Sequence, residues 1–331
     1  MATPRVSPRA IELLTSKDSS SIDTFWRWHT TPPKPSKLIP DQLYDLTMSP
    51  WTPLVFGAVY FVSAKLLSAN QNGKNRIQGK VWDVLVLMHN VLLAVYSGAT
   101  FVLTAPLFFG RFGKAAANDG LAGLTMAYCD TSVWGQDSRF PLLAWLFYVS
   151  KFYEVVDTAI ILAKGKKVGM LQSYHHFGAM LTMYAAYRTS AVPVWIFVCF
   201  NSLIHAIMYS YYSCTTVRLP FPRFLKKSIT RLQITQFIVG GSMAALYLFI
   251  QLPTSASSKV ASFDIGSNNL TRQMGSTATQ ILLSSQQQGG QCLASGAQKA
   301  AVLANIAYLL PLTGLFLQFF FSSYSKKSKT Q

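Results

Sequence analysis

Long apolar runs recur along this 331-residue chain, separated by polar segments. A run of about 18 or more such residues is long enough to cross the bilayer as a helix. Seven runs qualify, and each predicts a transmembrane helix: residues 51–69, 82–109, 140–163, 171–190, 192–217, 229–251 and 300–323. The pattern therefore predicts an all-α, polytopic membrane protein.

The segments outside these runs predict no separate soluble domain. Residues 1–50 form a polar, Pro-rich lead without the apolar core of a signal peptide, so the first spanning helix is expected to target the chain. Residues 252–299 are rich in Ser, Gln, Asn and Gly, a composition typical of a flexible loop. We thus expect one membrane domain, residues 51–323, and a short tail, residues 324–331.

Charge predicts the orientation of the chain. Half of the residues are apolar and only 12% are charged, yet the net charge is +17. The basic residues gather in alternate connections without acids, a distribution that argues for membrane topology and against nucleic acid as a partner. These connections contain Lys74, Arg76 and Lys80; Lys164, Lys166 and Lys167; Arg218, Arg223, Lys226, Lys227 and Arg231; and Lys326, Lys327 and Lys329. The positive-inside rule then puts the C-terminus in the cytosol and the N-terminus in the lumen.

Two short features agree with this orientation and with an endoplasmic reticulum address. The chain ends in KSKTQ, a lysine-based retrieval pattern, and Asn269 begins an NLT glycosylation sequon in the predicted lumenal loop 252–299. Cys129 and Cys292 both fall in predicted lumenal loops. They are expected either to form a disulfide with each other or to remain as two free thiols.

Ionisable side chains inside a spanning helix are costly and are functional candidates. In KFYEVVDT, Lys151, Glu154, Asp157 and Thr158 project within an arc of about 120°. Lys151 and Glu154 are spaced for an ion pair, which would be either structural or part of a site. Asp157 lacks an obvious local cation, so we expect it to take part in chemistry or to orient a histidine.

The next helices carry polar stripes of their own. Gln172, His175 and His176 share a face in LQSYHHFGAM, whereas His89 is expected to be a structural histidine. The remaining members of the predicted site are Asn201, His205, Met208, Tyr209, Tyr212, Gln233 and Gln236. Imidazole can act as base, acid, nucleophile or metal ligand. Five histidines are too few for a di-iron oxygenase, and a single-metal site from His175, His176, His205 and Asp157 stays a lesser alternative to a metal-free site.

Four motifs in order resemble the ELO family of very-long-chain fatty acid elongases, over about residues 45–325. They are K-x-x-E-x-x-D-T at 151–158, a histidine box ending at His175 and His176, N-S-x-x-H-x-x-M-Y-x-Y-Y at 201–212, and T-x-x-Q-x-x-Q at 230–236. The family box usually reads H-x-x-H-H, and this chain has Gln172 at its first position. A glutamine side chain can donate and accept hydrogen bonds but cannot titrate. The substitution therefore puts an essential role for that position in doubt.

The resemblance implies a fold and a reaction. The fold is seven transmembrane helices, six of them forming a barrel around a tunnel closed toward the lumen. The reaction condenses a long-chain acyl-CoA with malonyl-CoA to 3-ketoacyl-CoA, CO2 and CoA, without a cofactor. A histidine-based acyl transfer would use His175 as the nucleophile and His176 and His205 for proton handling, with direct condensation as the alternative. Implied partners are membrane lipids, a ketoacyl-CoA reductase, a hydroxyacyl-CoA dehydratase and an enoyl-CoA reductase, and a homo-oligomer is allowed.

Two anionic CoA moieties need positive charge at the cytosolic mouth of the tunnel. The expected phosphate contacts are Lys166, Lys167, Arg218, Arg223, Lys226 and Lys227, each of which would otherwise be a topology signal. Composition alone would also allow a seven-helix receptor or transporter, although no internal repeat is evident. The altered box further leaves open a noncatalytic scaffold that binds acyl-CoA without turnover.

Overall fold

The computed structural model describes residues 31–71, 76–135, 138–219, 222–252, 291–293 and 295–324. Within them the chain is helical, and the only strand-like pairing is an isolated bridge between Gln251 and Gln291. The described elements are α3 (Asp41–Met48), α4 (Trp51–Ala69), α5 (Lys80–Tyr128), η2 (Thr131–Trp134), α6 (Phe140–Tyr153), α7 (Val156–Ala163), α8 (Met170–Arg188), α9 (Val194–Thr216), α10 (Arg223–Leu246) and α13 (Gly296–Tyr324). The all-α prediction is confirmed for this part of the chain.

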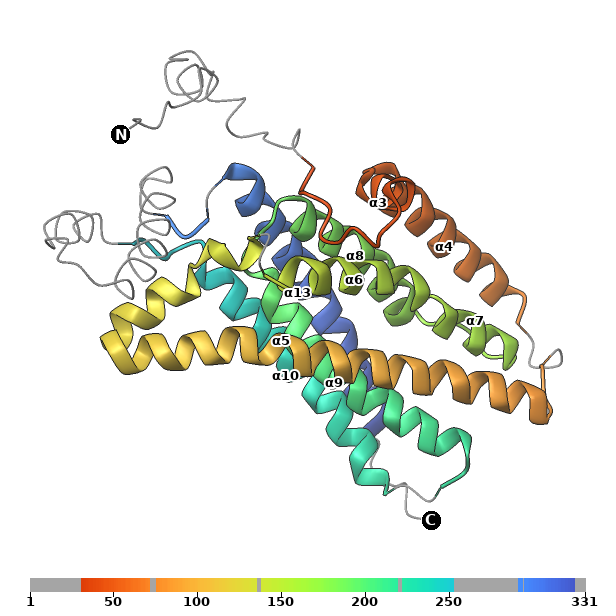
Figure 1. Cartoon of the computed structure of the whole chain (residues 1–331). Helices are drawn as coiled ribbons and strands as arrows, with labels where there is room; N and C mark the ends of the chain where they lie inside the picture. Colours follow the sequence, from red (N-terminus) through yellow and green to blue (C-terminus); the bar gives the residue numbers. More distant parts are fainter. Residues whose placement is uncertain are drawn as a thin grey trace, which may run out of the picture.

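Six helices pack in a cyclic order (Figure 1). Helix α5 packs along α9, α9 on α10, α10 on α13, α13 on α8, α8 on α6, and α6 returns to α5. Helix α4 stands outside this cycle and packs on α8 and α7. The polar stripes of α7, α8, α9 and α10 face one another inside it.

Four of the described helices are long and apolar enough to cross a membrane: α4, α5, α9 and α13. The remaining predicted spans coincide with helices that carry the polar site or are interrupted. The predicted span 140–163 is divided at Glu154 and Val155, where bonds to Asp157 and Thr158 tighten the backbone to an i, i+3 pattern. Helices α8 and α10 contain histidines, glutamines and basic residues among their apolar residues, which lowers their mean hydropathy. The chain is therefore a protein with several membrane-capable helices, and the count of seven stays a prediction.

Helix α5 is longer than the apolar run that predicted it. It continues through the expected loop 110–139 as far as Tyr128 and reverses direction at Gly120, whose φ of 57° suits a residue without a side chain. Hydropathy marks where a helix crosses lipid, not where its hydrogen bonds end, so the sequence missed this extension. Cys129 follows directly and forms a disulfide with Cys292, just before α13.

The predicted polar lead contains a helix that folds back on the bundle. The carbonyl of Thr47 in α3 accepts a hydrogen bond from Tyr148, and that of Met48 accepts one from Tyr184. The Trp145 indole donates to the Thr47 hydroxyl. Helix α3 is thereby fixed to α6 and α8 at the ends remote from the site.

Several predicted features lie outside the described residues. They are residues 1–30 of the lead, Lys74, most of the loop 252–299 with Asn269, and the tail that ends in KSKTQ. The side chain of Arg223 also lies outside the description.

Candidate active site

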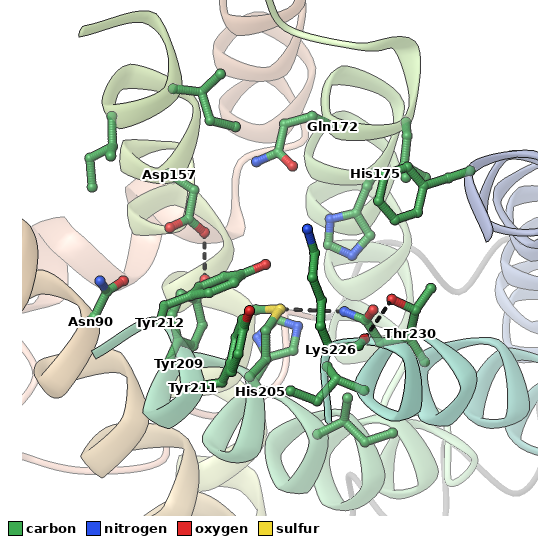
Figure 2. A pocket seen from close by; sticks show the side chains of 18 of the residues that line it. Asn90, Asp157, Gln172, His175, His205, Tyr209, Tyr211, Tyr212, Lys226 and Thr230 are labelled. Atoms are coloured by element: carbon green, nitrogen blue, oxygen red, sulfur yellow. Dashed lines mark hydrogen bonds between the residues drawn. The ribbon is translucent and has the colours of Figure 1, made fainter. Parts of the chain in front are cut away.

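A cavity of about 430 Å³ lies between α5, α7, α8, α9, α10 and α13; we call it the main cavity (Figure 2). The exposed lysines 164, 166 and 226 line what we call the lysine end, and the lining also includes three polar residues, His175, Asn201 and Gln236. A second void of about 40 Å³, the deep compartment, shares those three residues and continues between Phe197, Met183 and Leu312. His175, Asn201 and Gln236 thus line both cavities, whereas most of the other sequence-predicted polar residues line the main cavity alone.

Lys151 and Glu154 form the ion pair that their spacing predicted. The Lys151 Nζ donates to Glu154 Oε1 at 2.6 Å and to Asn201 Oδ1 at 3.2 Å, and it lies 4.0 Å from the centre of the Phe147 ring. Both side chains are 96% or more buried, and Glu154 does not line the main cavity. A pair so far removed from water depends on the exact placement of its partners.

Asp157, one turn further on, lines the main cavity and has a partner that the sequence reading did not assign. His89 Nε2 lies 2.9 Å from Asp157 Oδ1, and the Tyr209 hydroxyl donates to Oδ2 at 2.5 Å. The other nitrogen of His89 meets the Tyr153 hydroxyl at 3.2 Å. Asp157 therefore does orient a histidine, but one on α5 and not on α8.

A polar stripe on α5 was the signal that could have identified His89. Its buried residues recur every three or four positions and include Asn90, Ser97, Thr100 and Thr104. In a lipid-facing helix such a row marks the face turned toward protein. Asn90 also lines the main cavity.

Gln172 replaces the usual histidine of the box and binds its neighbour one turn on. Its Nε2 lies 2.8 Å from His176 Nε2 and 3.4 Å from the Thr158 hydroxyl, which in turn meets the Tyr60 hydroxyl at 2.9 Å. His176 is buried, and its Nδ1 has no hydrogen-bond partner in the described structure. The network anchors His176, and α4 contributes Tyr60 to it from outside the helix cycle.

His175 is placed differently from His176. It lines both the main cavity and the deep compartment, and its imidazole makes no hydrogen bond to any described residue. The two rings are 5.0 Å apart and inclined by 80°. Figure 2 shows the His175 ring directed into the cavity, with the Lys226 side chain extending in from α10. His175 thus has both ring nitrogens free of hydrogen bonds to described residues, as His205 does, and it is the one of these two that lines both cavities.

His205 lies between the two carboxylate networks. Its Nδ1 is 3.8 Å from Glu154 Oε1, and its ring is 5.6 Å from that of Tyr209. Across the cavity, Gln233 donates to the Met208 sulfur at 3.3 Å. The sequence-predicted residues on α9 and α10 that line the main cavity are Asn201, His205, Met208, Tyr209, Tyr212, Gln233 and Gln236.

The lysine end contains only part of the predicted phosphate-binding set. Lys166 and Lys226 line the main cavity, whereas Lys167, Arg218 and Lys227 do not, and Lys227 instead lies 5.7 Å from the Phe320 ring. Lys164, which the predicted set omitted, also lines it. Partial burial, together with the positive charge of Lys166, lowers the pKa of Lys164 from its ordinary value.

A metal site finds no support in this geometry. The residues that the structure describes contain no cluster of three or more His, Cys, Asp or Glu side chains placed to hold a metal ion. His89 bonds one oxygen of Asp157, and Tyr209 bonds the other.

Comparison with known proteins supports the motif resemblance. The family described as ELO, GNS1/SUR4 family, matches residues 45–331. Long chain fatty acid elongase 1 of Caenorhabditis elegans is 32% identical over 47% of this chain and 51% of its own length. Fatty acid elongase sre1 of Dictyostelium discoideum is 30% identical over 54% and 63%, and very long chain fatty acid elongase 3 of Homo sapiens is 27% identical over 55% and 64%. The matches thus span about half to two thirds of these relatives. No solved structure gives a significant match.

Proposed function

The chain belongs to the ELO (GNS1/SUR4) family, and from this premise we propose that it condenses a long-chain acyl-CoA with malonyl-CoA. The products would be 3-ketoacyl-CoA, CO2 and CoA, as for a 3-oxoacyl-CoA synthase. The observation that carries the proposal is His175, a histidine without a hydrogen-bond partner in the described structure, at the junction of two cavities.

The two cavities suit the two ends of an acyl-CoA. Lys164, Lys166 and Lys226 provide positive charge for CoA phosphates at one end of the main cavity. The deep compartment beyond His175 is lined largely by apolar side chains, among them Phe147, Ala179, Met183, Phe197, Leu309 and Leu312. The thioester would then lie beside His175 with its alkyl chain in the deep compartment. We propose that the six cyclically packed helices enclose this tunnel, with α4 outside.

In the first step we propose that a His175 nitrogen attacks the thioester carbonyl. A carbon–nitrogen bond forms, the carbon–sulfur bond breaks, and CoA leaves as the thiol with the proton that the imidazole gives up. The absence of a competing hydrogen bond on the ring favours this role for His175 over His176, whose Nε2 is bonded to Gln172. The acyl group is then held as an acyl-imidazole.

In the second step malonyl-CoA loses CO2, the resulting enolate carbon attacks the acyl carbon, and the carbon–nitrogen bond breaks. The departing imidazole takes up one proton, which His205 can relay from solvent. The thioester oxygen of the enolate needs hydrogen-bond donors while it carries negative charge. Tyr212 has an uncommitted hydroxyl, and Asn201 has an uncommitted amide nitrogen because only its oxygen is bonded to Lys151. The Tyr209 proton is already donated to Asp157, so Tyr209 acts through that carboxylate.

The remaining polar groups would transfer protons and orient the substrates during these two steps. His205 lies between Glu154 and the main cavity and can relay a proton to or from malonyl-CoA. His176, fixed by Gln172, would orient the thioester. Asp157, paired with His89, places a carboxylate at the cavity wall and provides a base within the site.

From the predicted retrieval tail and sequon we propose a multi-pass protein of the endoplasmic reticulum membrane with its N-terminus in the lumen. The ketone product requires a ketoacyl-CoA reductase, and full elongation also requires a hydroxyacyl-CoA dehydratase and an enoyl-CoA reductase. The same site could operate in a monomer or a homo-oligomer, because all of its residues come from one chain.

The test compares purified wild type with His175→Ala, using a panel of acyl-CoAs. Two quantities are followed: 3-ketoacyl-CoA from labelled malonyl-CoA, and CoA released when malonyl-CoA is omitted. We expect product from wild type and near-stoichiometric CoA release, with both lost in the variant. His175→Asn, which keeps a polar side chain of similar size, controls for a cavity defect and should be equally inactive.

Other results would replace this mechanism. Product without CoA release in the absence of malonyl-CoA would support direct condensation. Folded protein that binds acyl-CoA and forms no product from any member of the panel would contradict the proposed activity and favour the noncatalytic scaffold.

A further inference from the structure

The deep compartment contains two amide side chains that the proposed chemistry does not use. Asn305, on the inner face of α13, is 5% exposed, and Gln236, on α10, is 8% exposed. Neither side chain makes a hydrogen bond to any described residue, and Gln236 Oε1 is fully enclosed. Both line the same void. Two buried, unpaired amides facing one small space indicate a binding site.

The other polar groups around this compartment have partners, except the His175 ring and the Asn201 amide nitrogen, which the proposed chemistry uses. Lys151 binds Glu154 and Asn201, Thr182 donates to the carbonyl of Gly178, and Tyr308 donates to that of His175. The remaining wall is mostly apolar. The two amides are therefore not members of a hydrogen-bond network among the described protein groups that line the compartment.

The position of Asn305 relative to His175 follows from the packing of α13 on α8. Tyr308 lies against Gly178, where an added Cβ would come 2.1 Å from its ring. Asn305 lies one turn beyond Tyr308, and Thr182, which lines the same compartment, lies two turns beyond His175. The polar wall thus begins near His175 and extends about 10 Å along the expected path of the alkyl chain.

We propose that Gln236 and Asn305 form a subsite for a hydroxyl group carried within the acyl chain. This inference rests on the proposed function, because it assumes that the alkyl chain enters the deep compartment. A hydroxyl can donate to the Gln236 oxygen while it accepts from the Asn305 amide, which satisfies both. A fully saturated, unsubstituted chain fills the space but leaves both amides unpaired, which is unfavourable in an apolar site.

The size of the compartment makes this selectivity depend on position. A void of about 40 Å³ holds only a few water molecules, so an alkyl chain can enter it only as the surrounding side chains move apart. A chain that enters must displace that water, and a hydroxyl in register can replace its hydrogen bonds. A hydroxyl elsewhere along the chain meets apolar side chains instead. The subsite therefore selects acyl chains by the position of the hydroxyl oxygen as well as by chain length.

The experiment uses the full-length protein and acyl-CoAs of one length whose single hydroxyl is moved carbon by carbon from the carbonyl. The saturated chain and a cis-monounsaturated chain, which has a bend but no oxygen, are the references. We expect wild type to show the highest kcat/KM when the hydroxyl lies about 10 Å or less from the carbonyl. The advantage over the saturated chain should be about tenfold, and the cis chain should not share it.

Asn305→Leu supplies the decisive comparison. The apolar side chain of similar size should retain or raise kcat/KM for the saturated chain and abolish the hydroxyl advantage. Asn305→Thr keeps a hydrogen-bonding group and should retain part of it, which guards against a folding defect in the first variant. An equal loss for all substrates in both variants, or an unchanged preference in Asn305→Leu, would overturn the subsite.

A second readout separates this inference from the proposed function. Displacement of a fluorescent acyl-CoA by the same panel measures binding without turnover. If no chain is elongated but hydroxylated chains displace the probe at lower concentration in wild type than in Asn305→Leu, the subsite stands and the proposed reaction fails. If displacement does not depend on the hydroxyl or on Asn305, the subsite fails.

Discussion

Glu154 and Asp157 are carboxylates three residues apart, on the two sides of the break between α6 and α7, and their surroundings differ. Glu154 is almost fully buried against Lys151 and lies outside the main cavity. Asp157 has 18% of its side chain exposed and lines that cavity, with His89 and Tyr209 bonded to its two oxygens. Similar acids thus occupy a structural position and a candidate chemical position within one turn.

The difference arises from what packs opposite each acid. Glu154 faces the interior between α6 and α9, where only a permanent cation compensates its burial. Asp157 faces α5 and the cavity, where the histidine can share a proton with it and substrate can approach. We infer that charge on Glu154 holds helices together and charge on Asp157 acts on the substrate. The following predictions test this division, beginning with the largest effect.

Glu154→Gln should destabilise the protein most. It leaves the Lys151 ammonium buried without its anion, which typically costs about 3–5 kcal/mol. Thermal unfolding in detergent should show a clear fall in Tm and less monodisperse protein. The double variant Lys151→Met with Glu154→Gln removes the uncompensated charge and should recover part of this loss. A Tm equal to wild type for Glu154→Gln would show that the pair is not a structural one.

Asp157→Asn should instead affect turnover. The amide keeps one acceptor oxygen for its neighbours but loses the charge, and we expect kcat to fall by about 100-fold, as for loss of a general base. Its Tm should remain closer to wild type than that of Glu154→Gln. A variant that unfolds as readily as Glu154→Gln and is otherwise active would reverse the comparison.

His89→Gln tests whether His89 works through Asp157. Loss of a hydrogen bond to a charged group should lower kcat by roughly tenfold, with little change in the KM for acyl-CoA. In the Asp157→Asn background His89→Gln should lower kcat by a much smaller factor, because the two residues act as a unit. Additive effects in this cycle would place His89 in helix packing alone.

The smallest effect concerns the lysine end of the cavity that Asp157 faces. The pKa of Lys164 is lowered, so its charge is lost at a lower pH than that of an ordinary lysine. The KM for acyl-CoA should therefore rise in the alkaline range as Lys164 deprotonates. Lys164→Arg stays charged and should reduce this rise by about threefold, the scale of an exposed ion pair. An identical pH dependence of KM in both proteins would remove Lys164 from CoA binding.

Much of the fold and site could be predicted because the relevant forces act over short stretches of sequence. Apolar runs located helices, and the spacing of Lys151 and Glu154 predicted an ion pair that the structure contains. The positions of His175 and His205 on polar stripes placed them at the cavity. The sequence prediction was wrong about the end of α5, which continues to Tyr128, and it could not tell which basic residues line the main cavity, because both depend on distant packing.

His89 and Asn305 show the limit most clearly. Each is a polar residue in a largely apolar helix, and sequence spacing cannot say whether its partner is a protein group or a ligand. Only the packing of α5 against α7 gives His89 a carboxylate, and only the packing of α13 against α8 and α10 leaves Asn305 facing a void.

The sequence by itself determined the helical class, the polar faces and the family, because periodicity and motif spacing are local properties of the chain. The tertiary structure decided which polar groups bind one another, which remain free and where the cavity narrows. Those outcomes depend on contacts between residues far apart in the chain, such as Tyr60 with Thr158 and Cys129 with Cys292, which no local pattern encodes.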